Sequence, residues 1–250
     1  SAIDRSLVGS EMCIRDRIFR KQFVFEVRDL WPELPVAMGV IKNPVLVGLM
    51  KMLEVISYKL SDKVIALSEG MRQGVMQHVP ENKTVVITNG SDNHLAQIGK
   101  NVEFPSGIDE GDFVAVYSGT HGIANGLEVV VDSARALQEG VSNNIKILLI
   151  GDGMKKQELQ EKASNYGLTN LIFVPSMSKV ELFSLLQKCD VGLMVLQNVP
   201  AFYNGTSPNK FFDYLSVGLP VLCNYPGWIA KLIERENIGV SVAPDNAKEF

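Results

Sequence analysis

A lysine and a carboxylate three residues apart could together bind a ligand that carries both phosphate and hydroxyl groups. Lys210 and Asp213 share one face near the start of a predicted helix. A lysine beside the free N–H groups of a helix N-terminus makes an anion site. A carboxylate one turn further along can accept hydrogen bonds from sugar or ribose hydroxyls. From spacing alone, an ordinary exposed Lys–Asp pair is an equally good interpretation.

The residues around this pair predict a capped helix followed by a buried strand. Ser207 suits the N-cap, and Pro208 suits the first helical position, where a missing N–H is no loss. Gly218 suits the left-handed position just past the helix end, and Pro220 prevents the helix from continuing. A strand is predicted to follow at residues 219–223.

The stretch from Ser207 to Val221 reads SPNKFFDYLSVGLPV and resembles the donor-binding motif of GT-B glycosyltransferases of family 4. The resemblance implies a retaining, metal-independent enzyme that uses a nucleotide-sugar. It implies that Lys210 and Asp213 are the catalytic pair, with Lys210 on the leaving diphosphate and Asp213 on the ribose. In that family a second acidic residue usually lies eight positions earlier, where this chain has Gly205. The resemblance therefore gives no carboxylate contact to the transferred sugar from that position.

A glycine-rich turn, Ser118–Gly126, follows a predicted strand at 113–117 and leads into a helix with an apolar face. Such a turn lets backbone N–H groups approach a diphosphate, although glycines in turns often only relieve steric crowding. By resemblance, Gly119, Thr120 and Gly122 contact the donor phosphates. Thr120 and Asn125 stand where the family commonly has an arginine and a lysine.

The resemblance also assigns donor-binding roles to residues at other strand ends. Gly151 and Gly153 follow a predicted strand at 146–150, and Met177 follows one at 171–174, in the loop that recognises the base through backbone groups. The remaining predicted donor contacts lead into the motif helix: Thr206, Ser207, Pro208 and Asn209. His121 is as well suited to cap or pack locally as to contact the ligand, and residues 197–206 are predicted to form a loop.

Polar residues also follow a predicted strand at 22–27, at the strand end where open α/β sheets place ligands. By resemblance, this loop lines the acceptor side of the cleft, so Arg28 and Glu33 are expected to contribute from there, and a turn around a buried Trp31 is an equal alternative. A helix is predicted from Asn43 and Pro44 to Leu60. Its apolar residues cover more than one face, so we expect internal packing, although nearby lysines are compatible with an anionic membrane surface.

The alternation of strands and helices, with further strands at 63–67 and 84–87, predicts an α/β protein with parallel, doubly wound sheets. The resemblance implies the GT-B type, with two Rossmann-like domains. The predicted divisions are a non-native or disordered segment at 1–17, a partial N-terminal domain at 18–93, a linker at 94–112, and a C-terminal nucleotide-sugar-binding domain at 113–250. We expect the first domain to be incomplete and the second to be truncated at its end, as in a piece of a longer protein.

Composition limits the classes of function. The chain has 250 residues, of which 46% are hydrophobic and 21% charged, as in globular proteins. A formal net charge of −4 argues against a nucleic-acid binder. Three cysteines without metal-type spacing indicate a reduced, cytoplasmic protein, with Cys189 and Cys223 as core thiols. No apolar stretch of about 20 residues could span a membrane.

We therefore expect a hexosyltransferase that moves a hexose or N-acetylhexosamine from a UDP-linked donor to a glycan or lipid-linked acceptor in bacterial cell-surface polysaccharide synthesis. The sequence contains no Asp-x-Asp pair that would hold a divalent metal on the diphosphate, so we expect no metal cofactor. A peripheral contact with the inner membrane is compatible with this function. Two alternatives stay open. One is a sugar-nucleotide 2-epimerase of the same architecture, and the other is a non-catalytic remnant that only binds nucleotide-sugar.

Overall fold

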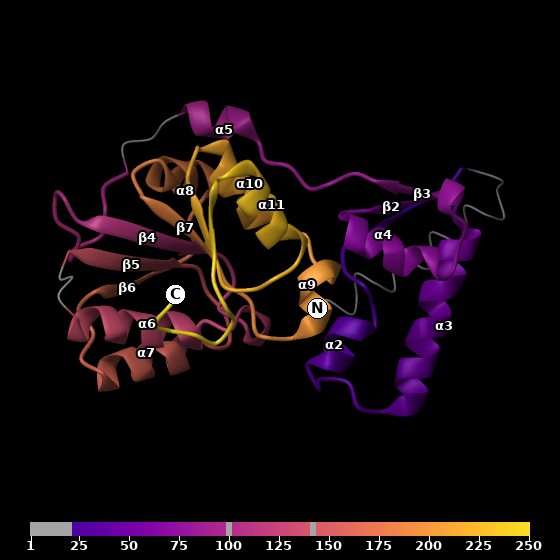
Figure 1. The fold of residues 1–250 in the computed structure, drawn as a ribbon, viewed down its shortest axis with the longest axis horizontal. Coiled ribbons are helices and arrows are strands. Elements are labelled where there is room, and N and C mark those ends of the chain that lie inside the picture. Colours follow the sequence, from indigo (N-terminus) through magenta and orange to yellow (C-terminus); the bar gives the residue numbers. More distant parts are fainter. Residues whose placement is uncertain (1–21, 99–101, 141–143) are drawn as a thin grey trace. The chain divides into compact units, whose positions relative to one another are not determined.

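The computed structural model describes residues 22–98, 102–140 and 144–250, and the chain divides into two compact units (Figure 1). The first unit comprises residues up to Asn89 together with Val199–Ser207, and the second comprises Gly90–Asn198 and Pro208–Phe250. The segment 1–17, predicted to be non-native or disordered, lies outside the described residues. Each unit is considered by itself below.

The first unit contains a parallel sheet of β1 (Val24–Val27), β2 (Lys63–Ala66) and β3 (Thr84–Val86), in that order. Its helical segments are α2 (Glu33–Ala37), α3 (Pro44–Leu60), α4 (Glu69–Met76), the 3₁₀ turn η1 (Glu81–Lys83) and α9 (Pro200–Gly205). Both α3 and α4 begin with a side-chain cap. The Asn43 side chain accepts a hydrogen bond from the Val45 N–H, and the Ser68 hydroxyl accepts one from the Met71 N–H.

Helix α3 packs less than its sequence predicted. Tyr58 is its one buried residue, and its ring packs against Phe25 of β1. Six apolar side chains form an exposed face, with exposed fractions from 42% at Ile56 to 70% at Val45; the others are Leu46, Leu49, Met52 and Leu53. The expectation of internal packing is therefore wrong for the described residues, because Tyr58 is the α3 residue that joins the buried cluster with Val27 and Val64 of the sheet. No helix in the described ranges is long and apolar enough to cross a membrane.

The second unit contains a six-stranded sheet in the order β6-β5-β4-β7-β8-β9, and all neighbouring strands are parallel. The strands are β4 (Phe113–Ser118), β5 (Ile145–Ile150), β6 (Leu171–Val174), β7 (Val191–Met194), β8 (Val221–Cys223) and β9 (Gly239–Ser241). Helices α6 (Glu128–Glu139) and α7 (Lys156–Asn165) lie on one face, and α8 (Lys179–Leu186), α10 (Asn209–Ser216) and α11 (Trp228–Glu236) lie on the other (Figure 1). The predicted doubly wound, parallel α/β architecture is confirmed.

Buried apolar side chains hold this sheet between its two helix layers. Val130 and Val131 of α6 and Leu159 of α7 pack in one cluster with Tyr117 and Leu149 of the sheet. Full burial of such an aliphatic side chain stabilises the fold by about 1.5–3 kcal/mol. The core thiols of Cys189 and Cys223 are buried as predicted, and burial raises the pKa of each to about 12.

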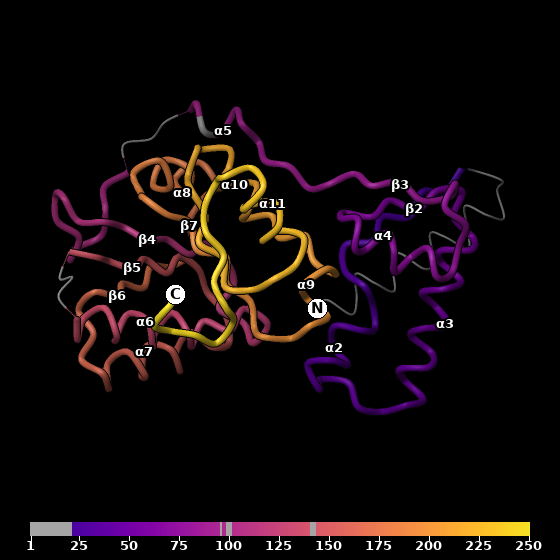
Figure 2. The backbone as a smooth tube through the Cα atoms, in the orientation of Figure 1, coloured from indigo at the N-terminus to yellow at the C-terminus, as the bar shows by residue number. Residues whose placement is uncertain are grey.

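Three short helices were not predicted from the sequence, and the first of them is α2, which begins in the turn predicted around Trp31. Helix α5 (Asn93–Ile98) begins the segment predicted as a linker, and α9 lies in the predicted loop 197–206. Figure 2 traces the chain after β7 as it enters the first unit, forms α9 and returns at Pro208. Helix α9 is held by a distant residue, because the Ser68 hydroxyl donates to the Asn204 carbonyl at 3.1 Å. Contacts across such a long separation leave no local sequence signal.

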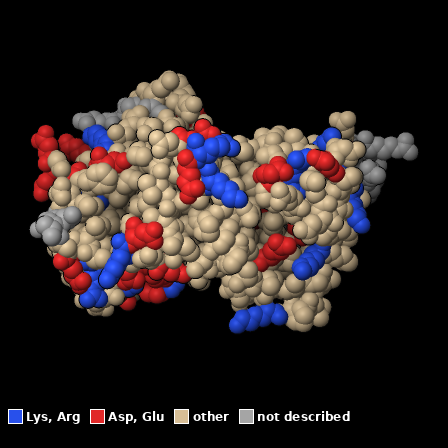
Figure 3. All heavy atoms as spheres, in the orientation of Figure 1, with Lys and Arg blue, Asp and Glu red and all other residues tan. Residues whose placement is uncertain are grey.

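Charged side chains of both signs are interspersed on the face drawn in Figure 3. Exposed ion pairs such as Arg135–Glu139 on α6 also bring charges of opposite sign together. A nucleic-acid-binding surface would gather lysine and arginine into a basic patch or stripe. The mixture on this face agrees with the formal net charge of −4.

Candidate functional site

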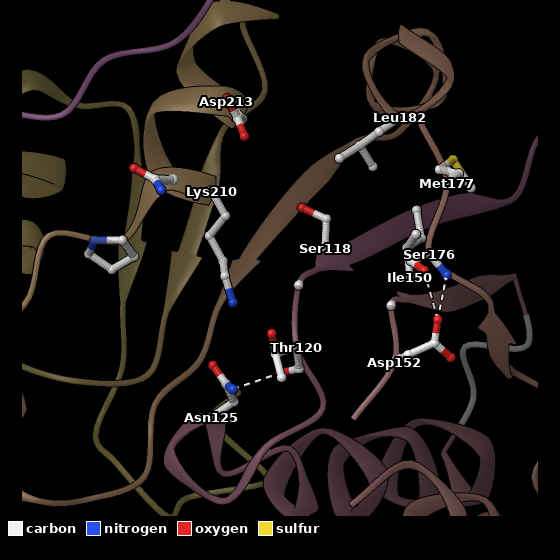
Figure 4. A pocket seen from close by; sticks show the side chains of 14 residues that line it. Ser118, Thr120, Asn125, Ile150, Asp152, Ser176, Met177, Leu182, Lys210 and Asp213 are labelled. Atoms are coloured by element: carbon white, nitrogen blue, oxygen red, sulfur yellow. Dashed lines mark hydrogen bonds between the residues drawn. The ribbon is translucent and has the colours of Figure 1, made fainter. Parts of the chain in front are cut away.

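A cavity of about 640 Å³ lies within the second unit, at the carboxyl ends of β4, β5 and β6. The chain order of the strands reverses beside it, between β4 and β7. Open α/β sheets bind their ligands in the crevice at such a switch point. Side chains from the strand ends form one wall, and the first two turns of α10 form another (Figure 4).

Lys210 lines this cavity, and no carboxylate of the described residues pairs with its amine. Its side chain extends from α10 toward the loop that carries Thr120 (Figure 4). The Nζ atom lies 3.7 Å from the centroid of the Tyr117 ring, which is a cation–π contact. Burial without a counterion lowers the pKa of Lys210 from 10.5 to about 7. An anion bound in the cavity would favour the charged amine, so the arrangement suits a phosphate group.

Gly119 leaves room for this amine, and Gly151 leaves room for the backbone of Gly119. Gly119 has φ +149°, and a Cβ built on it would lie 3.0 Å from Lys210 Nζ. Gly151 has φ +143°, and its Cβ would collide with the Gly119 carbonyl oxygen. Both residues line the cavity, so the backbone of two adjacent strand ends can approach a ligand closely.

Some of the other residues in the glycine-rich turns line the cavity and some do not. Thr120 and Asn125 line the cavity, and the Asn125 amide donates to the Thr120 carbonyl at 2.8 Å. Gly122 and Gly153, predicted as ligand contacts, do not line it. His121 is fully buried, and its ring lies near those of Tyr117 and Phe173. Burial lowers its pKa to about 4, so His121 is a neutral packing residue near pH 7, which agrees with the first of its two sequence interpretations.

Asp213 lies on the same wall as Lys210, one turn further along α10. Its carboxylate is 9% exposed and lines the cavity. The Ser91 hydroxyl donates to Oδ1 at 2.6 Å, and Lys179 Nζ lies 3.4 Å from the same oxygen. The structure therefore brings the two residues predicted as catalytic into one cavity, as their spacing indicated.

A second carboxylate at the opposite end of the cavity was not predicted as a site residue. Asp152 Oδ2 accepts hydrogen bonds from the backbone N–H and the hydroxyl of Ser176, at 2.9 and 2.8 Å (Figure 4). Lys156 Nζ lies 2.7 Å from the other carboxylate oxygen. Lys156 and then Ser176 hold the pKa of Asp152 well below its usual range. These bonds fix the loop that carries Met177, a predicted base contact that does line the cavity. The only sequence signal for Asp152 was its place between two glycines at a strand end.

The start of the motif helix differs from its sequence prediction. Helix α10 begins at Asn209 with Pro208 as its N-cap, so the assignment of Ser207 as the cap was wrong. Ser207 and Thr206 belong to the first unit and do not line the cavity. The Ser207 carbonyl accepts a hydrogen bond from the Asn89 side chain at 2.6 Å, and the chain reaches α10 through an extended Pro208. The helix end is as predicted, because Gly218 has φ +74°.

Pro208 and Asn209 line the cavity, and their contact with a donor stays a prediction. Arg28 and Glu33, the predicted acceptor-side residues, both belong to the first unit. Arg28 is 80% exposed and pairs with Glu26 at 2.8 Å, and Glu33 begins α2. Their part in ligand binding stays a prediction.

Comparison with known proteins now adds to this geometry. Residues 100–250 match the family described as "Glycosyl transferases group 1". The chain is 31% identical over 143 residues to WcaI of Escherichia coli (strain K12), which is named as a colanic acid biosynthesis glycosyl transferase. That match covers 52% of this chain and 34% of WcaI.

Solved structures with low sequence identity share the fold. Anabaena HepE (Alr3699), in complex with UDP and glucose, superposes with a TM-score of 0.70 at 19% identity, over 95% of this chain and 62% of HepE. WaaG, a glycosyltransferase of lipopolysaccharide biosynthesis, superposes with a TM-score of 0.64 at 15% identity, over 90% of this chain and 64% of WaaG. The chain thus spans about a third to two thirds of the length of these proteins, and the predicted GT-B fold is confirmed.

Proposed function

The chain belongs to the group 1 glycosyltransferases, and from that premise we propose that its second unit binds the nucleotide-sugar donor of a glycosyl transfer reaction. The donor would be UDP-linked, and the transferred group would be a hexose or N-acetylhexosamine. The acceptor would be a glycan or lipid-linked glycan of a bacterial cell-surface polysaccharide. Transfer would proceed with retention of the anomeric configuration and without a metal ion.

The observation that carries this proposal is the unneutralised amine of Lys210 at the switch point of the sheet. Negative charge develops on the leaving diphosphate in the transition state of a nucleotide-sugar reaction. A cation already oriented toward that position stabilises the charge without reorganisation. Backbone N–H groups near Gly119 and at the start of α10 would share in this role.

Asp213 would accept a hydrogen bond from a ribose hydroxyl, one helical turn from Lys210. This spacing on one helix would fix the nucleoside relative to the diphosphate. The proposal of a UDP-linked donor is supported by the UDP bound in HepE, a protein of the same fold. The role in surface polysaccharide is supported by the name of WcaI.

The exposed apolar face of α3 supports a location of the reaction at a membrane surface. A helix with such a face, flanked by Lys42 and Lys51, can lie against an anionic lipid surface. We therefore place the enzyme in the cytoplasm, in peripheral contact with the inner membrane, where a lipid-linked acceptor would be available.

Calorimetric titration with UDP, GDP and ADP tests the donor site. UDP should bind most tightly, and Asp213→Ala should weaken its binding, while Asp109→Ala, at an exposed position outside the cavity, serves as the control. If the chain binds none of the three nucleotides, the proposal is contradicted.

Turnover is then measured on a form extended to the full length of its relatives, with a UDP-sugar and a lipid-linked acceptor. A new glycoside whose anomeric configuration matches that of the donor supports retaining transfer. An epimerised donor formed without acceptor would show an epimerase instead. Tight donor binding without any product would show a binding protein.

A further inference from the structure

Asp213 is anchored by a residue from a distant part of the chain that neither the motif nor the family match assigns. Ser91 lies 122 residues earlier in the sequence, just before α5. Its hydroxyl donates to Asp213 Oδ1 at 2.6 Å, a short charge-assisted hydrogen bond. A buried carboxylate needs such partners, because an unpaired charge is costly to remove from water.

The packing of two helices brings a second donor to the same oxygen. Helix α5 packs against α8, and α8 begins with Lys179. Lys179 Nζ lies 3.4 Å from Asp213 Oδ1, and its side chain is 53% exposed. Because the distance is long and water screens the charge, we expect Lys179 to hold the carboxylate more weakly than Ser91 does.

Both contacts fall on one carboxylate oxygen. Within the described ranges no side chain or backbone group donates to Oδ2, and Asp213 lines the cavity. A carboxylate fixed through one oxygen presents the other in a constant direction. Oδ2 is therefore the acceptor available to a hydroxyl group of the ligand.

We propose that Ser91 is a positioning residue, which orients the Asp213 carboxylate so that Oδ2 accepts a hydrogen bond from a ribose hydroxyl of the nucleotide. This inference rests on the proposed function, because it takes the ligand to be a ribonucleoside diphosphate. Ser91 itself does not touch the ligand. Without its hydroxyl, the carboxylate can rotate about its side-chain bonds, and the directed contact with ribose is lost.

The test compares the affinity for UDP with the affinities for 2′-deoxy-UDP and 3′-deoxy-UDP by calorimetry. In the unsubstituted chain, UDP should bind about tenfold more tightly than the analogue that lacks the bonded hydroxyl, as expected for a hydrogen bond to a charged group. Ser91→Ala should reduce this ratio to near one without weakening the deoxy analogue. Ser91→Thr keeps a hydroxyl at this position and should preserve the ratio.

Two further variants complete the test. Ser106→Ala, at an exposed serine between α5 and β4, is the matched control and should leave every affinity unchanged. If the alanine variant does not fold, Ser91→Cys replaces it, because cysteine has nearly the same shape and is a weak donor. It should then show the reduced ratio.

The outcomes separate this inference from the proposed function. An equal loss of affinity for UDP and both deoxy analogues in Ser91→Ala would show a merely structural role and overturn the inference. A gain in UDP affinity would show that Ser91 competes with the ribose and would also overturn it. Failure of the unsubstituted chain to bind UDP would overturn the proposed function and the inference together.

Discussion

Replacement of Lys210 by methionine should change stability and ligand binding in opposite directions. The side chain keeps its approximate length and loses its charge. In the free chain the amine has no carboxylate partner among the described residues, and burial lowers its pKa from 10.5 to about 7. One pKa unit corresponds to about 1.4 kcal/mol. After allowance for screening by water in the open cavity and for the contact with Tyr117, we expect Lys210→Met to stabilise the chain by about 1–2 kcal/mol at pH 6.

The pH dependence of this gain has a defined sign. A lysine whose pKa is lower in the folded state binds fewer protons when folded than when unfolded. The destabilising effect of Lys210 is therefore fully present below pH 7. It is lost as the pH rises from about 7 toward 10.5. Urea unfolding at pH 6 and pH 9.5 should show the advantage of the variant at pH 6 and a smaller one at pH 9.5.

Binding of UDP should change in the other direction. Loss of a charge-assisted hydrogen bond to the diphosphate should weaken UDP by roughly 10–100-fold in calorimetry. Transfer by an extended form should fall by roughly 10²-fold or more, because charge develops on the leaving group. Lys231→Met, at an exposed position of α11, is the control and should change neither quantity by much. A variant that is less stable at pH 6, or that binds UDP normally, would refute the reasoning.

Three further predictions concern the residues that shape the cavity. Tyr214→Phe should destabilise the second unit by about 1–2 kcal/mol in urea unfolding, because the fully buried hydroxyl accepts from the Ser118 N–H at 3.0 Å; an unchanged midpoint would count against this contact. Gly151→Ala should cost about 1–3 kcal/mol in backbone strain alone, with a further loss from the clash with Gly119, and should abolish UDP binding; normal UDP binding would contradict this. Asp152 has a lowered pKa, so its bonds stabilise the fold above pH 3.8 and are lost as the pH falls below that value. Asp152→Asn should therefore unfold with a shallower pH dependence in acid, and an unchanged slope would show that these bonds contribute nothing.

Local sequence patterns determined the elements of this protein. The start of α3 at Asn43 and Pro44 and the left-handed Gly218 were predicted from residue type alone, because each acts on backbone groups within one turn of itself. The parallel sheets followed from the alternation of strands and helices. The place of Lys210 and Asp213 on one face of α10 followed from helical spacing.

Only the tertiary structure decided which groups surround those residues. The contact of Ser91 with Asp213 depends on the packing of α5 against α8, and the chain pattern near residue 91 carries no sign of it. Ser207 fitted the sequence preference for an N-cap, but residues 199–207 fold with the first unit and leave Pro208 at that position. The low pKa of Lys210 likewise arises from burial, with no carboxylate partner in the described part of the chain. Short-range conformational preferences depend on neighbouring residues, whereas the burial of a side chain and its long-range hydrogen-bond partners exist only after distant segments have packed together.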